Sequence, residues 1–271
     1  MKNFELIRKV ETALGGENAD FEARQIVYYA LGVDSTGFMK IRSDEADEKT
    51  IFQCEEMIIR RKNGEPLYYI LGKAEFYGLP FFVGEGVLIP RDDTEILVDT
   101  ALEKIKDIKN PRVLDLCSGS GAIAVAIAKN RPDACVTAVE KYDEAFSYLE
   151  KNIALNDVKN VILKKQDALE FFGEYDLVVS NPPYISERER STLAKEVLCE
   201  PQTALFADND GFMFYEKISE NFKLNKNFNI LFEIGFSMAK RVSEILKSNG
   251  YCDVEVIKDY GKNDRVVAAK K

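Results

Sequence analysis

A tetrapeptide suited to holding a planar nitrogen group follows the apolar run at 175–180; it reads Asn181-Pro182-Pro183-Tyr184. Each proline fixes its own φ near about −65° and pushes the preceding residue toward extended backbone, so few conformations remain available. The Asn181 carboxamide oxygen and the Pro182 carbonyl oxygen can accept hydrogen bonds from an NH2 group, and the Tyr184 ring can stack on its flat face. Taken alone, the tetrapeptide also fits a Pro-rich turn after a strand. Its place behind a second motif favours the clamp.

That second motif predicts a buried strand at 113–116, a glycine turn at 117–121 and a helix at 122–128. Glycines let the backbone approach a ligand, and the start of a helix offers unpaired N–H groups. Dinucleotide-binding enzymes hold pyrophosphate in the same way. Here the third glycine of that fingerprint is missing, and Asp115 at the strand end would repel phosphate and attract an ammonium group. A ligand that carries an amino-acid ammonium therefore fits better than a dinucleotide.

Two further expected strands lead to acidic residues. Residues 135–140 end on Glu140, about 25 residues after Asp115, near the ~20-residue offset at which such an acid binds a ribose hydroxyl. Residues 161–163 lead to Gln166-Asp167-Ala168, which could border an adenine ring. Each acid alone also fits a helix cap or a solvated turn. Three of them at the C-terminal ends of successive strands mark the edge where open α/β sheets bind ligands.

Composition narrows the chemistry. The chain has 271 residues, 46% of them hydrophobic, with no histidine and five cysteines that form no C-x-x-C pair. Lack of histidine excludes Ser-His-Asp hydrolysis and His-containing zinc sites, and scattered cysteines speak against structural zinc. We expect reduced thiols and no metal. Chemistry in which the leaving group is already activated, and the protein needs chiefly to align the reacting atoms, remains open.

Charge and hydropathy indicate where the protein works. The net charge is −9, from 46 acidic and 37 basic residues, which disfavours non-specific binding to nucleic acid. The best candidate for a local basic patch is Arg60-Arg61-Lys62, which is also typical of a helix end. Residues 1–11 resemble neither a signal peptide nor a membrane span, and no later segment approaches about 18 uninterrupted apolar residues. We expect a soluble, cytoplasmic protein without membrane contact.

Periodicity predicts three parts. Residues 1–65 should form a helical domain: a stripe at 6–14 ends at Gly15-Gly16, a helix capped by Asp20 ends at Gly32, and a third helix runs from about 43 to 62. Residues 66–92 should form a β-hairpin linker, with Gly78 and Pro80 in the turn region. In 93–271 strands and helices alternate, as a doubly wound sheet requires. The last two strands, near 251–257 and 265–269, leave no room for a helix and should form a hairpin.

The motif order D-L-x-x-G-x-G, acid, Q-D and N-P-P-Y resembles that of class I S-adenosylmethionine-dependent methyltransferases. More closely, roughly residues 55–271 are similar to the release factor glutamine methyltransferase family (PrmC/HemK type). The segments that carry this similarity lie outside the cofactor motifs, at 60–67, 69–72, 75–80, 88–91, 200–201, 204–206, 210–211, 233–235 and 264–267. They carry the family specificity, because N-P-P-Y alone is shared with DNA adenine methyltransferases.

The resemblance implies a seven-stranded, Rossmann-like methyltransferase sheet with a C-terminal antiparallel hairpin, preceded by the small helical domain and the hairpin linker. It implies S-adenosylmethionine as the cofactor, with S-adenosylhomocysteine as the product. The cofactor's ammonium would lie near Asp115, its ribose on Glu140 and its adenine beside Asp167 and Ala168. The implied cofactor-binding residues are Asp115, Cys117, Ser118, Gly119, Ser120, Gly121, Glu140, Asp167, Ala168 and Asn181.

The implied reaction is methylation of the side-chain amide nitrogen, N5, of the glutamine in the Gly-Gly-Gln motif of class-1 peptide chain release factors, which modulates translation termination. The catalytic residues would be Asn181, Pro182, Pro183 and Tyr184, with the proton leaving late to solvent. The helical domain would dock the release factor. The linker residues either help close the site or begin a helix; they are Pro90, Arg91, Thr94 and Glu95.

The sequence departs from the family pattern in small ways. Cys117 and Ser118 stand where the family often has Gly-Thr, Glu140 stands where Asp is usual, and Ala168 replaces a larger apolar residue. Three alternatives stay open: an N6-adenine DNA methyltransferase, a non-catalytic release factor or ribosome-binding protein, and a nicotinamide-dependent oxidoreductase. We expect a monomer that binds no nucleic acid directly.

Overall fold

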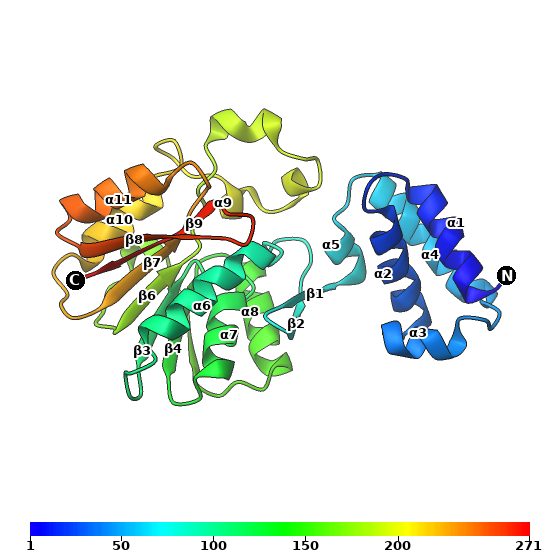
Figure 1. The fold of residues 1–271 in the computed structure, drawn as a ribbon, viewed down its shortest axis with the longest axis horizontal. Coiled ribbons are helices and arrows are strands. Elements are labelled where there is room, and N and C mark those ends of the chain that lie inside the picture. Colours follow the sequence, from blue (N-terminus) through cyan, green and yellow to red (C-terminus); the bar gives the residue numbers. More distant parts are fainter. The chain divides into compact units, whose positions relative to one another are not determined.

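The computed structural model describes all residues, 1–271, and divides into two compact units. The helical unit comprises Met1–Gly72 with Lys195–Cys199, and the sheet unit comprises Lys73–Ala194 with Glu200–Lys271. In Figure 1 the helices of the first unit are blue to cyan. The helical unit extends to residue 72, one helix beyond the expected boundary at 65, because Leu67, Ile70 and Leu71 pack into its core.

The helical unit buries one apolar stripe from each long helix. Its helices are α1 (Asn3–Leu14), α2 (Ala19–Leu31), α3 (Ser35–Ile41), α4 (Glu48–Lys62) and α5 (Leu67–Leu71). Leu6 and Val10 of α1, Ile26 of α2 and Cys54 of α4 are fully buried in a common core. The predicted ends of the first two helices are confirmed, since α1 stops at Gly15 and α2 at Gly32, both with positive φ.

Two predictions about helix starts in this unit are wrong. Asp20 is not a cap: Asn18 precedes the first residue of α2, and Asp20 lies in the first turn, where its charge favours the helix N-terminus. The third helix was expected to start at about residue 43, but α4 starts at Glu48, and the separate helix α3 precedes it. Asp34 caps α3 by accepting from Gly37 N at 2.6 Å, and Asp47 caps α4 by accepting from Thr50 N at 2.7 Å.

The hairpin expected in the linker is present but shorter. Strands β1 (Lys73–Phe76) and β2 (Leu79–Phe82) are joined by Tyr77 and Gly78, which have φ of 55° and 67°. Positive φ at both turn residues matches the twist of a two-residue hairpin. Pro80 was expected in the turn, and that expectation is wrong: it pairs with Glu75 inside β2. A proline is tolerated there because β2 has a partner on one side only.

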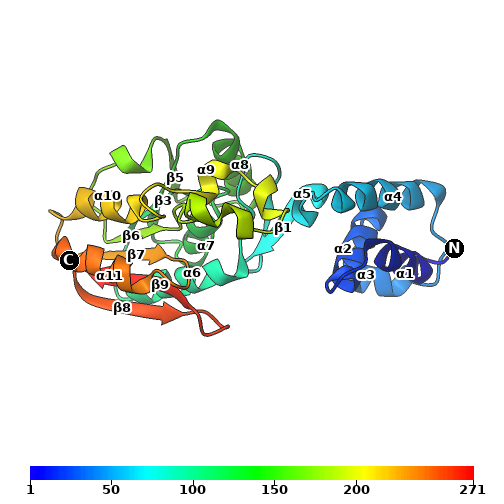
Figure 2. The same ribbon diagram turned by 90° about the horizontal axis from the view of Figure 1, so that it is seen from above.

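The sheet unit has the predicted methyltransferase architecture, with seven strands in the order β5-β4-β3-β6-β7-β9-β8. The first five are parallel, and the last two form the predicted antiparallel hairpin, drawn in red in Figure 2. The strands are β3 (Arg112–Leu116), β4 (Cys135–Glu140), β5 (Val161–Lys165), β6 (Leu177–Ser180), β7 (Asn229–Glu233), β8 (Cys252–Lys258) and β9 (Asp264–Lys270).

Alternating residues of the central strands face two separate cores. Val113 packs in one core with α6 (Glu95–Lys104), α7 (Ala122–Asn130) and α8 (Asp143–Leu155). Leu114 and Leu116 pack in the other core with α10 (Met213–Phe222) and α11 (Ala239–Ser248). Because successive side chains of a strand point to opposite faces, both faces of the sheet are apolar and both are covered by helices. Short elements complete the unit: the helix α9 (Gln202–Leu205) and 3-10 turns at Asp92–Thr94, Ala168–Glu170 and Glu187–Thr192.

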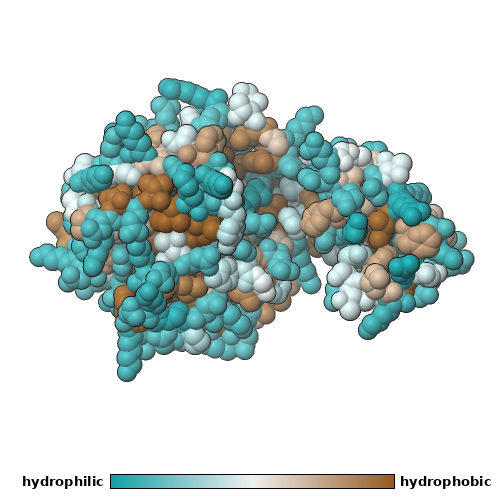
Figure 3. All heavy atoms as spheres, in the orientation of Figure 1, coloured by the Kyte–Doolittle hydropathy of each residue, from teal (hydrophilic) through white to brown (hydrophobic).

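The surface of both units is predominantly polar. Figure 3 shows hydrophilic residues over most of the visible face, with smaller hydrophobic areas between them. None of the helices combines the length and the apolar character needed to cross a membrane.

Candidate active site

The parallel strands bring the sequence motifs to one edge of the sheet. Leu116 at the end of β3 pairs with Val139 of β4 and with Ser180 at the end of β6. The glycine turn, Glu140 and Asn181 begin where these strands end. Strands β4 and β6 lie on opposite sides of β3, so the strand order switches at β3, and open α/β sheets bind ligands at such a switch point.

The glycine turn is held in a conformation that side chains disfavour. Cys117, Gly119 and Gly121 have φ of 61°, 53° and 83°. A Cβ at Gly121 would lie 2.5 Å from Cδ1 of Leu149, whereas a Cβ at Gly119 would meet nothing within 4 Å. Gly121 is therefore required by packing against α8, and Gly119 leaves open space beside the backbone for a ligand.

Glu140 organises this turn from the end of β4. Its carboxylate accepts three backbone hydrogen bonds, from Gly119 N at 2.8 Å, Lys141 N at 2.8 Å and Tyr142 N at 2.9 Å. Burial raises its pKa, and these hydrogen bonds oppose the rise. A carboxylate offers about four lone-pair sites, so one remains for a further donor such as a hydroxyl.

Asp167 closes the other side of the edge. Its carboxylate caps the 3-10 turn that begins at Ala168, accepting from Leu169 N at 2.9 Å, and it pairs with Lys141 Nζ at 2.8 Å. Burial favours a higher pKa, but the Lys141 and Leu169 hydrogen bonds outweigh it and leave the pKa lowered. Ala168 is buried beside it. Asp167 and Ala168 thus place a carboxylate next to a small apolar surface.

Asp115 does not face the crevice. It is fully buried, neither carboxyl oxygen has a hydrogen-bond partner, and it is absent from the cavity wall. Leu114 and Leu116 point to the α10–α11 core, so position 115 points to the opposite face of β3, the one that α7 covers. Burial raises the pKa of Asp115 to about 7. Asp115 thus lies beneath the glycine turn and outside the cavity wall.

Asp115 should make stability depend on pH. Because its pKa in the folded chain, about 7, exceeds its ordinary value of 3.8, stability gained from the bound proton is lost as the pH rises through about 7. We expect the free energy of unfolding to fall between about pH 4 and pH 7, and to fall less steeply for Asp115→Asn, by up to about 1.4 kcal/mol per pH unit. Urea unfolding of both proteins across this range measures the slopes.

The difference in slope between wild type and Asp115→Asn reports on Asp115 alone. Glu233, whose pKa burial also raises to about 7, is present in both proteins, so its contribution cancels in the difference between the slopes. Equal slopes for wild type and Asp115→Asn would show that Asp115 is ionised in the folded chain throughout this range.

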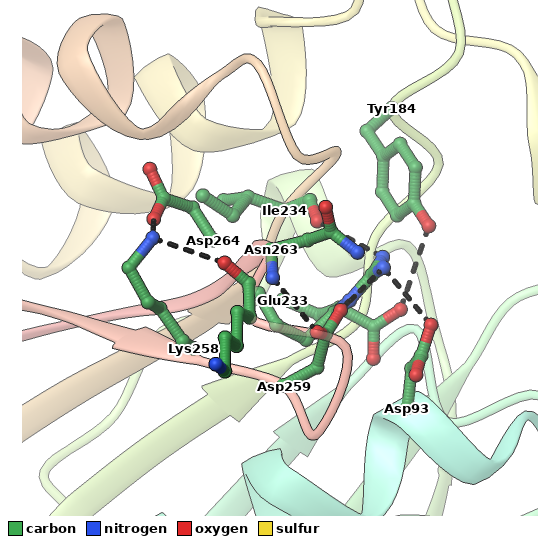
Figure 4. Close-up of polar contacts among 10 residues, drawn as sticks. Asp93, Tyr184, Glu233, Ile234, Lys258, Asp259, Asn263 and Asp264 are labelled. Atoms are coloured by element: carbon green, nitrogen blue, oxygen red, sulfur yellow. Dashed lines mark hydrogen bonds and ion pairs between the residues drawn. The ribbon is translucent and has the colours of Figure 1, made fainter.

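The N-P-P-Y tetrapeptide lies partly in the wall of the site and partly outside it. Asn181 is half-buried, with its Nδ2 3.4 Å from Thr94 Oγ1. Tyr184 is half-buried too, and Figure 4 shows its hydroxyl pointing toward Glu233, 3.5 Å from Oε1. Burial, and then the charge of Glu233, raise the pKa of Tyr184 far above its usual range, so its hydroxyl stays protonated.

Gly211 supports the tetrapeptide from a distant segment of the chain. Its φ is 89°, and a Cβ there would lie 2.1 Å from the carbonyl oxygen of Tyr184. Only glycine allows this approach of two backbones. The Asp210-Gly211 match to the family pattern was the sequence signal for this residue, although its role could not be read from it.

A cavity of about 570 Å³ lies at this edge of the sheet unit. Among the residues predicted to bind the cofactor or to catalyse, it is lined by Cys117, Ser118, Gly119, Ser120, Glu140, Asp167, Ala168, Asn181 and Pro183. Four of the predicted residues lie outside its wall: Asp115, Gly121, Pro182 and Tyr184. Nine of the thirteen predicted residues therefore line the cavity.

Linker residues complete the cavity. Pro90, Arg91 and Thr94 line it, whereas Glu95 is the first residue of α6, as the helix-start alternative expected, and its carboxylate accepts from Tyr77 N at 2.7 Å in the hairpin. Glu200, almost fully buried, fixes this segment by pairing with Arg91 and accepting from Ile89 N at 3.0 Å. Its sequence signal was again only a family match.

Comparisons with known proteins identify the family and the fold. The PrmC N-terminal domain family matches residues 5–72, and the Methyltransferase small domain family matches residues 92–231. The release factor glutamine methyltransferase of Fusobacterium nucleatum is 44% identical over 267 residues, covering 95% of this chain and 75% of that protein. That of Thermodesulfovibrio yellowstonii is 40% identical over 258 residues, covering 92% of both chains. The chain belongs to the release factor glutamine methyltransferase family.

Membership of this family makes the protein an S-adenosylmethionine-dependent methyltransferase. Solved structures share the fold at low sequence identity. The catalytic domain of hMettl16, solved with an RNA hairpin, has a TM-score of 0.57 at 17% identity, covering 83% of this chain and 82% of that one. A methyltransferase from Pyrococcus furiosus has a TM-score of 0.51 at 17% identity, covering 79% and 96%.

Proposed function

We propose that the protein transfers a methyl group from S-adenosylmethionine to the side-chain amide nitrogen, N5, of the glutamine in the Gly-Gly-Gln motif of class-1 peptide chain release factors, and so modulates translation termination. Relatives at 33–44% identity that are named release factor glutamine methyltransferases support the substrate class. The observation that carries the proposal is the cavity that has both the glycine turn and the carboxamide of Asn181 in its wall.

The residues in the wall fit the cofactor. Glu140 keeps a lone-pair site for a ribose hydroxyl, and Gly119 leaves open space for a ligand to approach the backbone. Asp167 and Ala168 would border the adenine. Asp115 would act on the ammonium through its charge from beneath the turn instead of by direct contact, since it has no hydrogen-bond partner and no place in the wall.

The N-P-P-Y residues would hold the glutamine amide. Asn181 Oδ1 and the Pro182 carbonyl oxygen accept its two N–H hydrogens, Pro183 keeps the turn rigid, and the half-buried Tyr184 ring stacks on the amide plane. An amide nitrogen is a poor nucleophile because its lone pair is delocalised. Gripping both hydrogens in one geometry favours the transition state, in which that lone pair turns toward the methyl carbon.

The chemistry needs little more than alignment. When bound, S-adenosylmethionine supplies an activated methyl group, so we propose neither a metal nor a strong base, and the amide proton leaves to solvent. The apolar parts of the wall would exclude water from the nucleophile. We further propose that the helical unit docks the release factor, that residues 66–92 act as the linker to the catalytic domain at 93–271, and that the protein acts as a cytoplasmic monomer without direct contact to nucleic acid.

Transfer of label tests this function. The protein is incubated with methyl-labelled S-adenosylmethionine and one of three acceptors: a class-1 release factor, the same factor with the Gly-Gly-Gln glutamine changed to alanine, or duplex DNA. We expect label in the first acceptor alone. Label in DNA would support the adenine alternative, and label in both release factors would place the methyl group on another residue.

A further inference from the structure

One arginine of the cavity wall is held by a carboxylate that lies outside the wall. Glu200 is 4% exposed and does not line the cavity, whereas its partner Arg91 lines it and keeps 40% of its side chain exposed. Glu200 Oε1 binds Arg91 Nη2, and Glu200 Oε2 accepts from Ile89 N at 3.0 Å. Both oxygens of one buried carboxylate thus fix the linker, while Arg91 stays accessible from the cavity.

Most of the Arg91 guanidinium is left for a ligand. It carries five N–H donors in a planar fork, and its hydrogen bond to Glu200 comes from Nη2 alone. The two other basic residues of the wall, Lys141 and Arg190, pair with acidic residues that themselves line the cavity. Arg91 differs from both, because the acid that pairs with it leaves the cavity side of the guanidinium open.

Arg91 lies on the part of the wall next to the N-P-P-Y clamp. Thr94 of the same linker segment also lines the cavity, and its Oγ1 is 3.4 Å from Asn181 Nδ2. Burial raises the pKa of the Tyr184 hydroxyl, and the positive charge of Arg91 is among the charges that oppose this rise. The contact and the charge effect both place the guanidinium close to the residues that would hold the acceptor amide.

The cofactor would bring a carboxylate to this part of the wall. S-adenosylmethionine has one anionic group, the carboxylate of its methionine part, a few bonds from the sulfonium sulfur. The sulfonium has to lie at the clamp, because a methyl carbon and its nucleophile react from about 3 to 3.5 Å apart. With the ribose on Glu140, the methionine part is the one that remains for the linker side of the cavity.

Guanidinium and carboxylate groups suit each other in geometry and charge. Their hydrogen bonds are short, charge-assisted and often bidentate. A guanidinium can also serve two carboxylates at once, and this chain contains such a case: Arg265 Nη2 binds Asp93 at 2.9 Å and Asp259 at 3.0 Å. Figure 4 shows these two contacts. The pairing of Arg91 with Glu200 is therefore compatible with a second carboxylate on the cavity side.

We propose that Arg91 binds the carboxylate of S-adenosylmethionine, and that Glu200 is a positioning residue that holds the guanidinium at the cavity wall. The inference rests on the proposed function, because it takes Glu140 as the ribose site and the clamp as the site of the acceptor amide. It assigns the linker segment to the methionine end of the cofactor.

Two probes that differ in the amino-acid part test the role of Arg91. Calorimetry measures the Kd of S-adenosylmethionine and of 5′-methylthioadenosine, which keeps the adenine, ribose and sulfur but has no carboxylate. For Arg91→Met we expect the Kd of S-adenosylmethionine to rise by about 10- to 30-fold and that of methylthioadenosine to stay within about twofold. Arg91→Lys keeps a charge for Glu200 without the planar fork, and should show a smaller rise for S-adenosylmethionine alone.

Equal losses for the two probes would overturn the proposal, since Arg91 would then only shape the wall. An unchanged Kd of S-adenosylmethionine in both Arg91 variants would overturn it too. The matched control is Arg190→Met, which removes another arginine of the wall, with 36% of its side chain exposed and a pair to Glu187 at 2.5 Å. Its Kd for S-adenosylmethionine should change by less than about twofold, and a loss equal to that of Arg91→Met would contradict a specific contact.

A double-mutant cycle tests the positioning role of Glu200. Glu200→Gln keeps an acceptor for Ile89 N but loses the charge that holds Arg91, so the Kd of S-adenosylmethionine should rise by about 3- to 10-fold. Glu200→Asp keeps the charge and should recover part of this loss. In an Arg91→Met background Glu200→Gln should add no further loss, because the residue through which it acts is gone. The same loss in both backgrounds would show that Glu200 acts on the fold in general.

These measurements need no release factor, which separates this inference from the proposed function. Failure of the wild-type protein to methylate a release factor, with the difference between the two probes intact, would remove the substrate assignment alone. Loss of the difference between the probes, with methylation intact, would remove the role of Arg91 alone.

Discussion

Replacing Asn181 by alanine is expected to lower kcat for glutamine methylation by about 10²- to 10³-fold, the cost typical of removing one preorganised group from a transition-state site. The substrate amide would lose the acceptor that the Thr94 contact orients toward the cavity. The Kd of S-adenosylmethionine should change by less than about threefold, since Glu140 and the glycine turn are left intact. Single-turnover methylation and calorimetric titration of the cofactor measure the two quantities separately.

A second amide residue in the same cavity provides the control. Gln202 lines the wall and accepts from Arg190 Nη2 at 3.1 Å, away from the clamp. Gln202→Ala should therefore retain kcat within about fivefold. Should Asn181→Ala retain a rate close to that of Gln202→Ala, the role assigned to Asn181 is lost.

Replacing Glu140 by alanine is expected to raise the Kd of S-adenosylmethionine by about 10²-fold or more, because charge-assisted hydrogen bonds to the turn and to a ribose hydroxyl disappear together. The three backbone N–H groups that Glu140 binds would also lose their acceptor, so the turn would no longer be held open for the ligand. Calorimetry measures this effect, and thermal unfolding checks that the variant is folded.

Asp143 is the matched control for Glu140. It lies in the first turn of α8, pairs with Lys165 and is exposed. Its removal should change the Kd by less than about twofold, as expected for an exposed ion pair. A variant of Glu140 that binds the cofactor as tightly as wild type would show that the ribose lies elsewhere.

Much of the site could be predicted from the sequence because its residues follow parallel strands. Glu140 is the last residue of β4, Asp167 lies two residues after β5 and Asn181 comes directly after β6; the carboxyl ends of parallel strands share one edge of a sheet. The glycine turn was visible for a similar reason, since Gly121 is required both by its φ and by the approach of Leu149. Strand and glycine patterns, together with the rule that parallel strands end at one edge of the sheet, were enough to predict these residues.

The rest depends on contacts between distant segments, which no spacing reveals. Glu233 contacts Tyr184, Glu200 pairs with Arg91, and Gly211 supports Tyr184 only after the chain has folded. The burial of Asp115 follows from the pleat of β3. The alternation that packs Leu114 and Leu116 on one face of the sheet turns Asp115 toward the other face.

Location of the transferred methyl group tests the central claim most directly. After incubation with S-adenosylmethionine, the class-1 release factor is digested and its Gly-Gly-Gln peptide is sequenced by tandem mass spectrometry. We expect one added methyl group on the glutamine side-chain nitrogen with wild-type protein, and none with Asn181→Ala under single-turnover conditions. A methyl group on another residue of the peptide, or an unmodified peptide with the wild-type protein, would contradict the account.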